Sequence, residues 1–274
     1  MVSEVELNNG VRIPQLGYGV YRIPDGDVAG AVHRAFEAGY RSIDTATLYR
    51  NERGVGQAVR ESGLPREDVF VTTKLWNTEH GYDEALRAFE GSLRQLGLDY
   101  VDLYLIHWPV PSRDRYVDTW RALEKIASDG RARAIGVSNF QAPHLRRLID
   151  ETGVVPAVNQ IELHPWLQQP KLRAFHEEHG IATEAWSPIA RGGERLSGSE
   201  VISTVARKHG KTPAQVVLRW HIELGHIAIP KSVTPERIKQ NIDVFDFEFD
   251  EQDVAGFATL EAGERLGPHP DTHS

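Results

Sequence analysis

The sequence predicts an α/β protein of the (β/α)8 TIM-barrel class with an N-terminal β-hairpin. The chain has 274 residues, a length that one such barrel accommodates. Short apolar or β-branched runs alternate along it with segments of 3.6-residue periodicity, which is typical of parallel βαβ units. The rival fold, an open doubly wound sheet, would need a third glycine where Arg22 follows Gly17 and Gly19. We therefore expect one barrel domain over residues 1–274.

The hairpin and the strands can be placed in order along the chain. Residues 5–7 and 11–13 alternate apolar and polar side chains on either side of an Asn8-Asn9-Gly10 turn, which predicts the hairpin. The expected barrel strands are residues 15–19, 41–44, 69–74, 101–107, 132–138, 157–161, 181–186 and 227–231. The first of these is rich in glycine and gives the weakest signal.

The segments between the strands are predicted to be amphipathic helices. Residues 85–96, for example, repeat apolar side chains at helical spacing. Residues 200–224 should hold two helices, divided near Gly210 and Pro213. The tail at 267–271 is rich in proline and glycine, and we expect it to be extended or loose.

The composition excludes several classes of function. Cysteine is absent, so disulfides, thiolate nucleophiles and cysteine-based zinc sites are excluded, and we predict no metal site. A formal net charge of −8 disfavours binding to nucleic acid or to an anionic membrane. The chain shows neither a secretory leader nor a stretch apolar enough to span a bilayer. We expect a cytoplasmic monomer that acts on a small molecule.

Ionisable side chains end three successive predicted strands. These residues are Asp44, Lys74 and His107, and Tyr49 follows Asp44 in the next loop. Each residue alone is more simply explained as the start of a solvated loop. Because neighbouring strands lie about 5 Å apart and barrel chemistry occurs at their C-terminal ends, the three side chains should converge on one mouth. A proton-transfer site is the expected result.

These residues belong to a set of short motifs that occur in order along the chain. The motifs are Asp-Thr-Ala-Thr-Leu-Tyr-Arg-Asn-Glu at 44–52, Val-Thr-Thr-Lys at 71–74, Leu-Ile-His-Trp-Pro at 105–109, Gly-Val-Ser-Asn-Phe at 136–140, Asn-Gln-Ile-Glu at 159–162, Trp-Ser-Pro at 186–188 and Ile-Pro-Lys-Ser at 229–232. In this combination the chain resembles the aldo-keto reductases over essentially its whole length. Residues 16–21 and 267–272 are similar to those of the bacterial 2,5-diketo-D-gluconate reductases.

The resemblance implies an NADPH-dependent carbonyl reductase with a catalytic tetrad of Asp44, Tyr49, Lys74 and His107. A carbonyl that accepts hydride develops alkoxide charge and needs a nearby acid, which Tyr49 would supply. A cationic Lys74 would lower the pKa of this phenol from about 10, and Asp44 would hold Lys74 charged and in place. His107, in its neutral form, would orient the carbonyl or assist proton transfer, and these two roles stay open.

The resemblance also implies the contacts of NADPH and NADP+. The nicotinamide carboxamide would meet Ser138, Asn139 and Gln160, and the ring would stack on Trp186, where most family members have Tyr. The pyrophosphate would lie against the backbone of residues 187–192, with contacts from Ser187, Ile189, Arg191 and Gly192. The 2′-phosphate and adenine would lie at the helix that follows the last strand, at Lys231, Ser232, Val233, Arg237 and Asn241.

The substrate contacts and the identity of the carbonyl are less closely specified. Tyr21, Trp76 and Trp108 lie just past predicted strand ends, so with His107 they would line a pocket, although core packing is an alternative for each. Diketo sugar acids such as 2,5-diketo-D-gluconate, methylglyoxal and other small aldehydes remain open. Two rival functions are a redox-sensing nicotinamide-binding module with little turnover and a barrel hydrolase that pairs Glu162 with Asp44.

Overall fold

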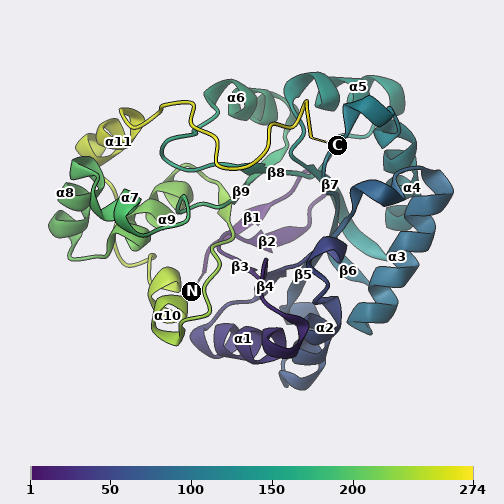
Figure 1. The fold of residues 1–274 in the computed structure, drawn as a ribbon, viewed down its shortest axis with the longest axis horizontal. Helices are drawn as coiled ribbons and strands as arrows, with labels where there is room; N and C mark the ends of the chain where they lie inside the picture. The colour runs from purple at the N-terminus through teal and green to yellow at the C-terminus, as the bar shows by residue number, and fades with distance from the viewer. Residues whose placement is uncertain (1, 274) are drawn as a thin grey trace.

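The computed structural model describes residues 2–273 and has the predicted barrel class (Figure 1). An eight-stranded parallel sheet has the order β10-β9-β8-β7-β6-β5-β4-β3, and β1 and β2 form a separate antiparallel hairpin. The strands are β1 (Glu4–Glu6), β2 (Arg12–Pro14), β3 (Tyr18–Gly19), β4 (Ser42–Asp44), β5 (Phe70–Leu75), β6 (Val101–Ile106), β7 (Ala132–Ser138), β8 (Val158–Glu162), β9 (Ala182–Trp186) and β10 (Ile227–Ala228).

Helices surround the strands, as Figure 1 shows. The α-helices are α1 (Asp25–Ala38), α2 (Glu52–Glu61), α3 (Tyr82–Leu96), α4 (Tyr116–Ser128), α5 (Ala142–Thr152), α6 (Pro170–His179), α7 (Glu194–Ser197), α8 (Glu200–His209), α9 (Pro213–Glu223), α10 (Pro235–Ile242) and α11 (Glu251–Ala258). Short 3-10 helices are η1 (Thr47–Tyr49), η2 (Arg66–Asp68), η3 (Asn77–Glu79) and η4 (Pro111–Arg113). The predicted division of residues 200–224 into two helices is confirmed, with α8 ending before Gly210 and α9 beginning at Pro213.

The two edge strands of the sheet approach each other and close the barrel. The Gly17 amide donates to the Ala228 carbonyl (2.9 Å), and the Ala228 amide donates to the Gln15 carbonyl (2.9 Å). A Cβ atom at Gly19 would lie 3.0 Å from the Ile229 carbonyl oxygen, so a glycine permits this close approach. The glycine-rich run that gave the weakest strand signal is therefore the seam of the barrel.

Most predicted strand bounds agree with the structure to within one residue, and the first and last strands are shorter. β10 ends at Ala228, whereas the prediction extended it to residue 231. The Ile229 amide still donates to the Ala185 carbonyl (3.2 Å), but Pro230 has no N–H to continue the ladder. The chain therefore leaves the sheet early and begins the segment that leads to α10.

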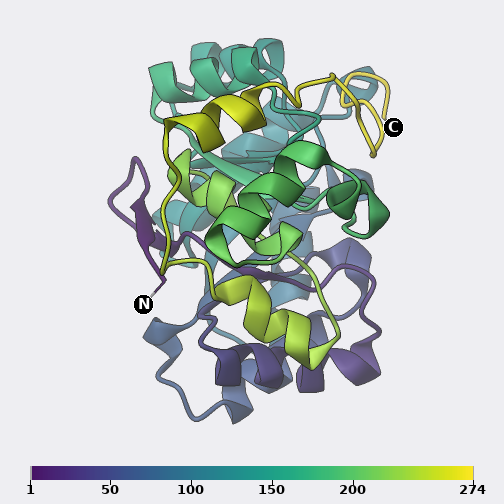
Figure 2. The same ribbon diagram turned by 90° about the vertical axis from the view of Figure 1, so that its left-hand side faces the viewer.

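The hairpin covers the N-terminal end of the barrel. Leu7 and Ile13 are buried in a cluster with Phe70, Leu103 and Ile227 from the barrel strands. Figure 2 shows the hairpin on the opposite side of the molecule from the C-terminal tail. The C-terminal ends of the strands are thus left to the loops and the tail.

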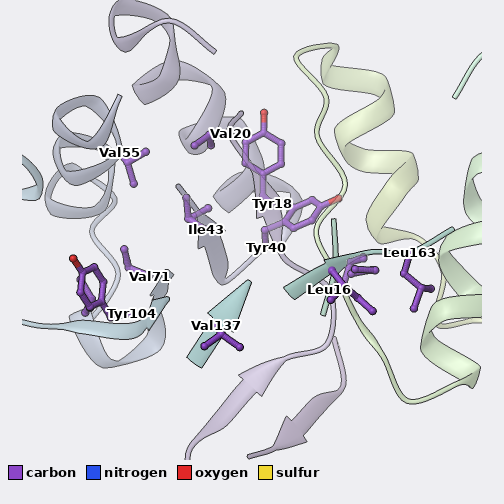
Figure 3. Packing of buried hydrophobic residues seen from close by; sticks show 14 of the residues in the cluster. Leu16, Tyr18, Val20, Tyr40, Ile43, Val55, Val71, Tyr104, Val137 and Leu163 are labelled. Atoms are coloured by element: carbon purple, nitrogen blue, oxygen red, sulfur yellow. The ribbon is translucent and has the colours of Figure 1, made fainter. Parts of the chain in front are cut away.

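Apolar packing between the strands and the surrounding helices forms the main core. Figure 3 shows part of this core, with Tyr18 of β3 beside Tyr40 and with Ile43 and Val71 from the next two strands. The rings of Tyr18 and Tyr40 meet edge to face, with their centroids 5.7 Å apart. Among residues 2–273, no helix combines the length and apolar content needed to cross a membrane.

Candidate active site

The structure brings the predicted tetrad together at the C-terminal ends of the strands. Lys74 of β5 donates from Nζ to Asp44 Oδ1 of β4 (2.6 Å) and to the Thr45 carbonyl (2.9 Å). The same Nζ lies 3.5 Å from the hydroxyl of Tyr49. The ring of His107, which follows β6, lies 5.8 Å from the ring of Tyr49, centroid to centroid. The four side chains come from three consecutive βα units and lie close together at the end of the barrel.

A hydrogen-bonded loop positions Tyr49. Thr45 donates from Oγ1 to Asn51 Oδ1 (2.7 Å), and the Asn51 amide donates to the carbonyls of Val20 (3.0 Å) and Ile23 (2.9 Å). Asn51 is fully buried, so this bridge ties the segment after β4 to the segment after β3. Tyr49 lies between Thr45 and Asn51 and is held by both ends of the loop.

The expectation of a depressed pKa for Tyr49 is wrong for this structure. Burial raises the pKa of Tyr49 to about 12, and this effect exceeds the lowering by the Lys74 ammonium. The cation lies 3.5 Å from the hydroxyl and 5.1 Å from the ring centroid, while the phenol is largely surrounded by protein. Tyr49 is therefore a neutral phenol across the physiological pH range.

Lys74 and His107 are both buried, but Lys74 is charged and His107 is neutral. Burial lowers the pKa of Lys74, but the Asp44 carboxylate and Tyr49 outweigh it, so the pKa lies above its ordinary value. Burial and the nearby Lys74 cation hold the pKa of His107 well below its ordinary value. His107 is thus neutral, as expected, and its Nδ1 has no hydrogen-bond partner within residues 2–273.

The predicted substrate residues form an aromatic wall next to the tetrad. The ring of Tyr21 lies 5.0 Å from that of Tyr49, and the ring of Trp76 lies 5.2 Å from that of His107. Tyr21 is 49% exposed, so it lies at the rim. Trp108 is buried, because the ring of His273 lies 4.3 Å from it.

His273 reaches this wall because the C-terminal tail is fixed to the barrel, which the sequence did not predict. The amides of Leu266 and Gly267 donate to the buried carboxylate of Glu162. Glu162 also pairs with His164 (3.0 Å), and these interactions lower its pKa despite burial. The tail, which was expected to be extended or loose, forms no helix or strand over residues 267–271, but it is held in place at its start by Glu162. Glu162, which the hydrolase alternative paired with Asp44, is committed to anchoring the tail.

The residues predicted to contact nicotinamide form a connected network. Trp186 donates from Nε1 to Asn139 Oδ1 (2.8 Å), and Asn139 donates from Nδ2 to the His107 carbonyl (3.0 Å). Ser138 donates from Oγ to the Gln160 carbonyl (2.8 Å). Trp186 remains partly exposed, so its orientation is fixed while part of its ring is accessible. These residues suit a flat ring that carries an amide.

Gln160 reveals a site residue that the sequence analysis missed. Its Nε2 donates both to Asp44 Oδ2 (2.8 Å) and to Glu184 Oε2 (3.0 Å). Burial and the Asp44 carboxylate raise the pKa of Glu184 to about 8. The available signal was a glutamate, the only charged residue, inside the predicted strand at residues 181–186.

The predicted phosphate contacts lie at the start of α10. Lys231 and Arg237 are exposed, and within residues 2–273 neither forms an ion pair or a side-chain hydrogen bond. Thr234 occupies the N-cap position, but its side chain does not cap the helix. The hydroxyl of Tyr18 donates to the Ser232 carbonyl and holds this segment against the core. Unpaired cations beside an uncapped helix N-terminus fit an anionic group such as a phosphate.

The remaining predicted cofactor contacts lie on either side of this segment. Val233 is 50% exposed and Asn241 is buried on α10. The backbone after β9 takes left-handed conformations at Ser187 (φ 50°) and Arg191 (φ 68°). The guanidinium of Arg191 donates to the Leu266 carbonyl (2.9 Å), so this side chain contacts the tail. Ile189 and Gly192 belong to the same loop and are partly buried.

No cluster of three or more His, Cys, Asp or Glu side chains that could hold a metal ion occurs within residues 2–273.

Comparison with known proteins identifies relatives of this chain. The model of the aldo/keto reductase family matches residues 14–262. An aldo-keto reductase of Mycolicibacterium smegmatis is 57% identical over 272 residues, which cover 99% of this chain and 98% of the relative. Methylglyoxal reductase DkgA of Salmonella typhimurium is 51% identical over 267 residues, covering 97% and 96%.

The fold of this chain also matches solved structures closely. The crystal structure of a mutant of Gox0644 in complex with NADPH superimposes with a TM-score of 0.96 at 47% identity. The match covers 100% of this chain and 99% of that protein. That structure contains NADPH bound to the same fold.

Proposed function

The chain belongs to the aldo/keto reductase family and is an NADPH-dependent carbonyl reductase, and we propose that it reduces small aldehydes and ketones with Tyr49 as the proton donor. One observation carries the assignment of residues. The buried Lys74–Asp44 pair lies against a neutral Tyr49 hydroxyl, at the end of the barrel where this fold performs its chemistry.

The chemistry of the four side chains supports their roles. When NADPH is bound it supplies a hydride, and negative charge then develops on the carbonyl oxygen. Tyr49 carries its proton at neutral pH, because its pKa is about 12, and gives it to that oxygen. The Lys74 ammonium then stabilises the phenolate that is left, since its Nζ lies 3.5 Å from the hydroxyl. Neutral His107 is suited to orient the carbonyl by a hydrogen bond.

The residues present fit the cofactor. Ser138, Asn139 and Gln160 offer hydroxyl and amide groups for a carboxamide, and Trp186 offers a partly exposed ring for stacking. The segment at 187–192 would follow the pyrophosphate. Lys231, Ser232, Val233, Arg237 and Asn241 would hold the 2′-phosphate and the adenine. We assign the unpaired Arg237 to the 2′-phosphate, the group that distinguishes NADPH from NADH.

The relatives suggest the substrate class. The chain is 51% identical to methylglyoxal reductase DkgA, and its sequence resembles the 2,5-diketo-D-gluconate reductases. We propose small dicarbonyl compounds of these kinds as substrates, with contacts from Tyr21, Trp76, His107 and Trp108. The aromatic wall is compatible with several carbonyl compounds, because most of its surface makes apolar contacts, which do not require a fixed direction.

A panel of carbonyl compounds tests this function. Methylglyoxal, 2,5-diketo-D-gluconate and small aromatic aldehydes are compared by kcat/KM with NADPH, and we expect turnover for at least the dicarbonyl compounds. Tight NADPH binding without turnover would instead support a redox-sensing module. Hydrolysis of a glycoside in the absence of NADPH would support the hydrolase alternative.

We also propose that the protein is a cytoplasmic monomer that binds neither nucleic acid nor membranes. The formal net charge of −8 supports the absence of both polyanionic partners. Light scattering during gel filtration tests the oligomeric state. A mass of twice the chain would overturn the monomer.

A further inference from the structure

A second carboxyl group, Glu184, lies inside the barrel next to the tetrad. Glu184 belongs to β9, is 1% exposed and stands opposite Gln160 of β8 in the parallel register. Its Oε2 accepts a hydrogen bond from Gln160 Nε2 (3.0 Å). The same Nε2 donates to Asp44 Oδ2 (2.8 Å) from the opposite side of the barrel, since β4 and β8 are four strands apart in the ring of eight. One amide group therefore bridges the interior between two carboxyl groups.

This arrangement fixes which way the Gln160 amide faces. The NH2 group has two hydrogens, and each carboxyl group takes one of them. The reverse orientation would place the amide oxygen against Oδ2 of the Asp44 carboxylate, which is electrostatically unfavourable. Oε1 of Gln160 accepts no hydrogen bond from side chains or backbone within residues 2–273. Gln160 can therefore offer a ligand an acceptor but not a donor.

The charges in the barrel explain how Glu184 can stay there. Asp44, Lys74 and Glu184 are all buried, and one cation faces two carboxyl groups. Lys74 pairs directly with Asp44 (2.6 Å), and the pKa of Glu184 is raised by burial and by that same carboxylate. The raised pKa favours the protonated form of Glu184. Both protonation states keep an oxygen that accepts the Gln160 hydrogen, so the contact survives the titration.

We propose that Glu184 is a positioning residue, which with Asp44 locks the Gln160 amide so that its oxygen faces the nicotinamide carboxamide. This inference rests on the proposed cofactor role of Gln160. Glu184 itself touches no reacting atom, and it acts through Gln160. A carboxamide presents an NH2 group, which is the partner that a fixed acceptor requires.

Two variants of Glu184 test the proposal by NADPH fluorescence titration. Glu184→Met removes both oxygens while filling a similar volume, and Glu184→Asp withdraws the carboxyl group by one methylene. Each should weaken NADPH binding by about 2- to 13-fold, the effect of one lost neutral hydrogen bond. Glu184→Gln keeps an accepting oxygen and should restore binding to within about twofold of the wild type.

A fragment and a control variant separate positioning from general damage. The fragment 2′-phospho-ADP-ribose lacks nicotinamide, so its affinity should stay at the wild-type value in every Glu184 variant. Glu52→Gln is the matched control, because Glu52 is also a buried carboxyl group with a raised pKa but is held by Thr73 (2.6 Å) and does not contact Gln160. NADPH affinity should be unchanged in this control.

The outcomes separate this inference from the proposed function. Wild-type NADPH affinity in Glu184→Asp and Glu184→Met would overturn the positioning role, as would an equal loss of fragment binding. Failure of Glu184→Gln to restore binding would also overturn it. If Glu184→Met does not fold, Glu184→Asp decides the question. A wild-type protein that binds the fragment but neither NADPH nor NADP+ would refute the cofactor assignment itself.

Discussion

The two ends of the barrel both bury a carboxylate, but they surround it differently. At the N-terminal end, Asp102 of β6 accepts hydrogen bonds from Arg66 (2.8 Å), Arg133 (2.8 Å) and the Val71 amide (2.9 Å). Two arginine side chains therefore form ion pairs with one carboxylate at this end. At the C-terminal end, the single cation of Lys74 pairs with Asp44, and Glu184 is hydrogen-bonded by Gln160 instead of by a cation.

The difference separates a structural cluster from a chemical one. Both oxygens of Asp102 are bonded, and both arginines are partly exposed, while Nε of Arg66 is buried without a hydrogen-bond partner within residues 2–273. At the other end, Lys74 lies 3.5 Å from the Tyr49 hydroxyl, and Nδ1 of His107 has no partner within residues 2–273. A buried aspartate therefore pairs with two arginines at one end, while at the other end it holds a lysine beside the Tyr49 hydroxyl, the group that we propose for proton transfer.

The largest expected effect tests the C-terminal end. Tyr49→Phe should lower kcat by about 10²–10⁴-fold, because it removes the proposed general acid. NADPH affinity and thermal stability should stay near the wild-type values. The rate is measured at saturating NADPH and carbonyl substrate.

A second tyrosine provides the control for that experiment. Tyr104 is fully buried on β6, and its hydroxyl has no partner within residues 2–273, so Tyr104→Phe should leave kcat unchanged. A Tyr49→Phe enzyme with the wild-type kcat would show that another group donates the proton.

The N-terminal end should show the opposite behaviour. Asp102→Asn leaves Arg66 and Arg133 without their counter-charge, and we expect a loss of unfolding free energy near the low end of roughly 3–5 kcal/mol. Partial exposure of the arginines limits the loss. Urea denaturation measures this value, and kcat below the transition should match the wild type. A catalytic defect in a fully folded variant would contradict the division between the two ends.

A smaller effect tests whether an unpaired charge marks a ligand site. Arg237 has no ion pair within residues 2–273, unlike Arg66 and Arg133. Arg237→Ala should weaken NADPH binding by about 10- to 150-fold, the effect of one charge-assisted hydrogen bond, and should barely change NADH binding. Fluorescence titration with both cofactors measures the asymmetry. Equal losses for the two would refute the assignment to the 2′-phosphate.

The smallest effect per group comes from the barrel wall between the two ends. Burial lowers the pKa of His176 and of His221 to about 3. The unfolded state therefore binds more protons below pH 6.5, and stability should fall as the pH decreases through that value. Each of these histidines contributes about 1.4 kcal/mol per pH unit once the pH lies well below 6.5.

Unfolding titrations between pH 7.5 and 5 measure this slope. Replacing His176 with Gln should reduce the slope by the contribution of one proton. A His176→Gln slope equal to that of the wild type would show that His176 is not held neutral in the folded protein.

The comparison of the two ends also explains what the sequence could predict. Asp44, Lys74 and His107 were found because each ends a strand, and parallel strand ends meet at one side of a barrel. Glu184 was missed because its contact is with Gln160 on the neighbouring strand. Gln160 in turn contacts Asp44 on the opposite side of the barrel. Such a contact depends on barrel closure and on register, which periodicity does not specify.

The sequence also did not predict the net shift of the Tyr49 pKa or the long-range contacts that hold the tail. The expected depression of the Tyr49 pKa considered Lys74 but not the burial of the phenol, and burial has the larger effect. The tail was expected to be loose because Pro and Gly are frequent in it, whereas Glu162 fixes it through two backbone amides. The buried carboxylate lies more than 100 positions away in the chain, so no local pattern links the two.

The fixed tail has a practical consequence for preparing the protein. His273 packs on Trp108 at the mouth, whereas the N-terminal hairpin lies on the far side of the barrel (Figure 2). A purification tag or surface linker joined at the C-terminal side therefore begins beside the proposed substrate pocket, where we expect the imidazoles of the tag to compete with carbonyl compounds. The same tag joined ahead of Val2 begins at the opposite end. Immobilisation through the hairpin side keeps the linker away from the proposed substrate pocket. We therefore expect the KM measured for a carbonyl compound to depend on which end carries the tag.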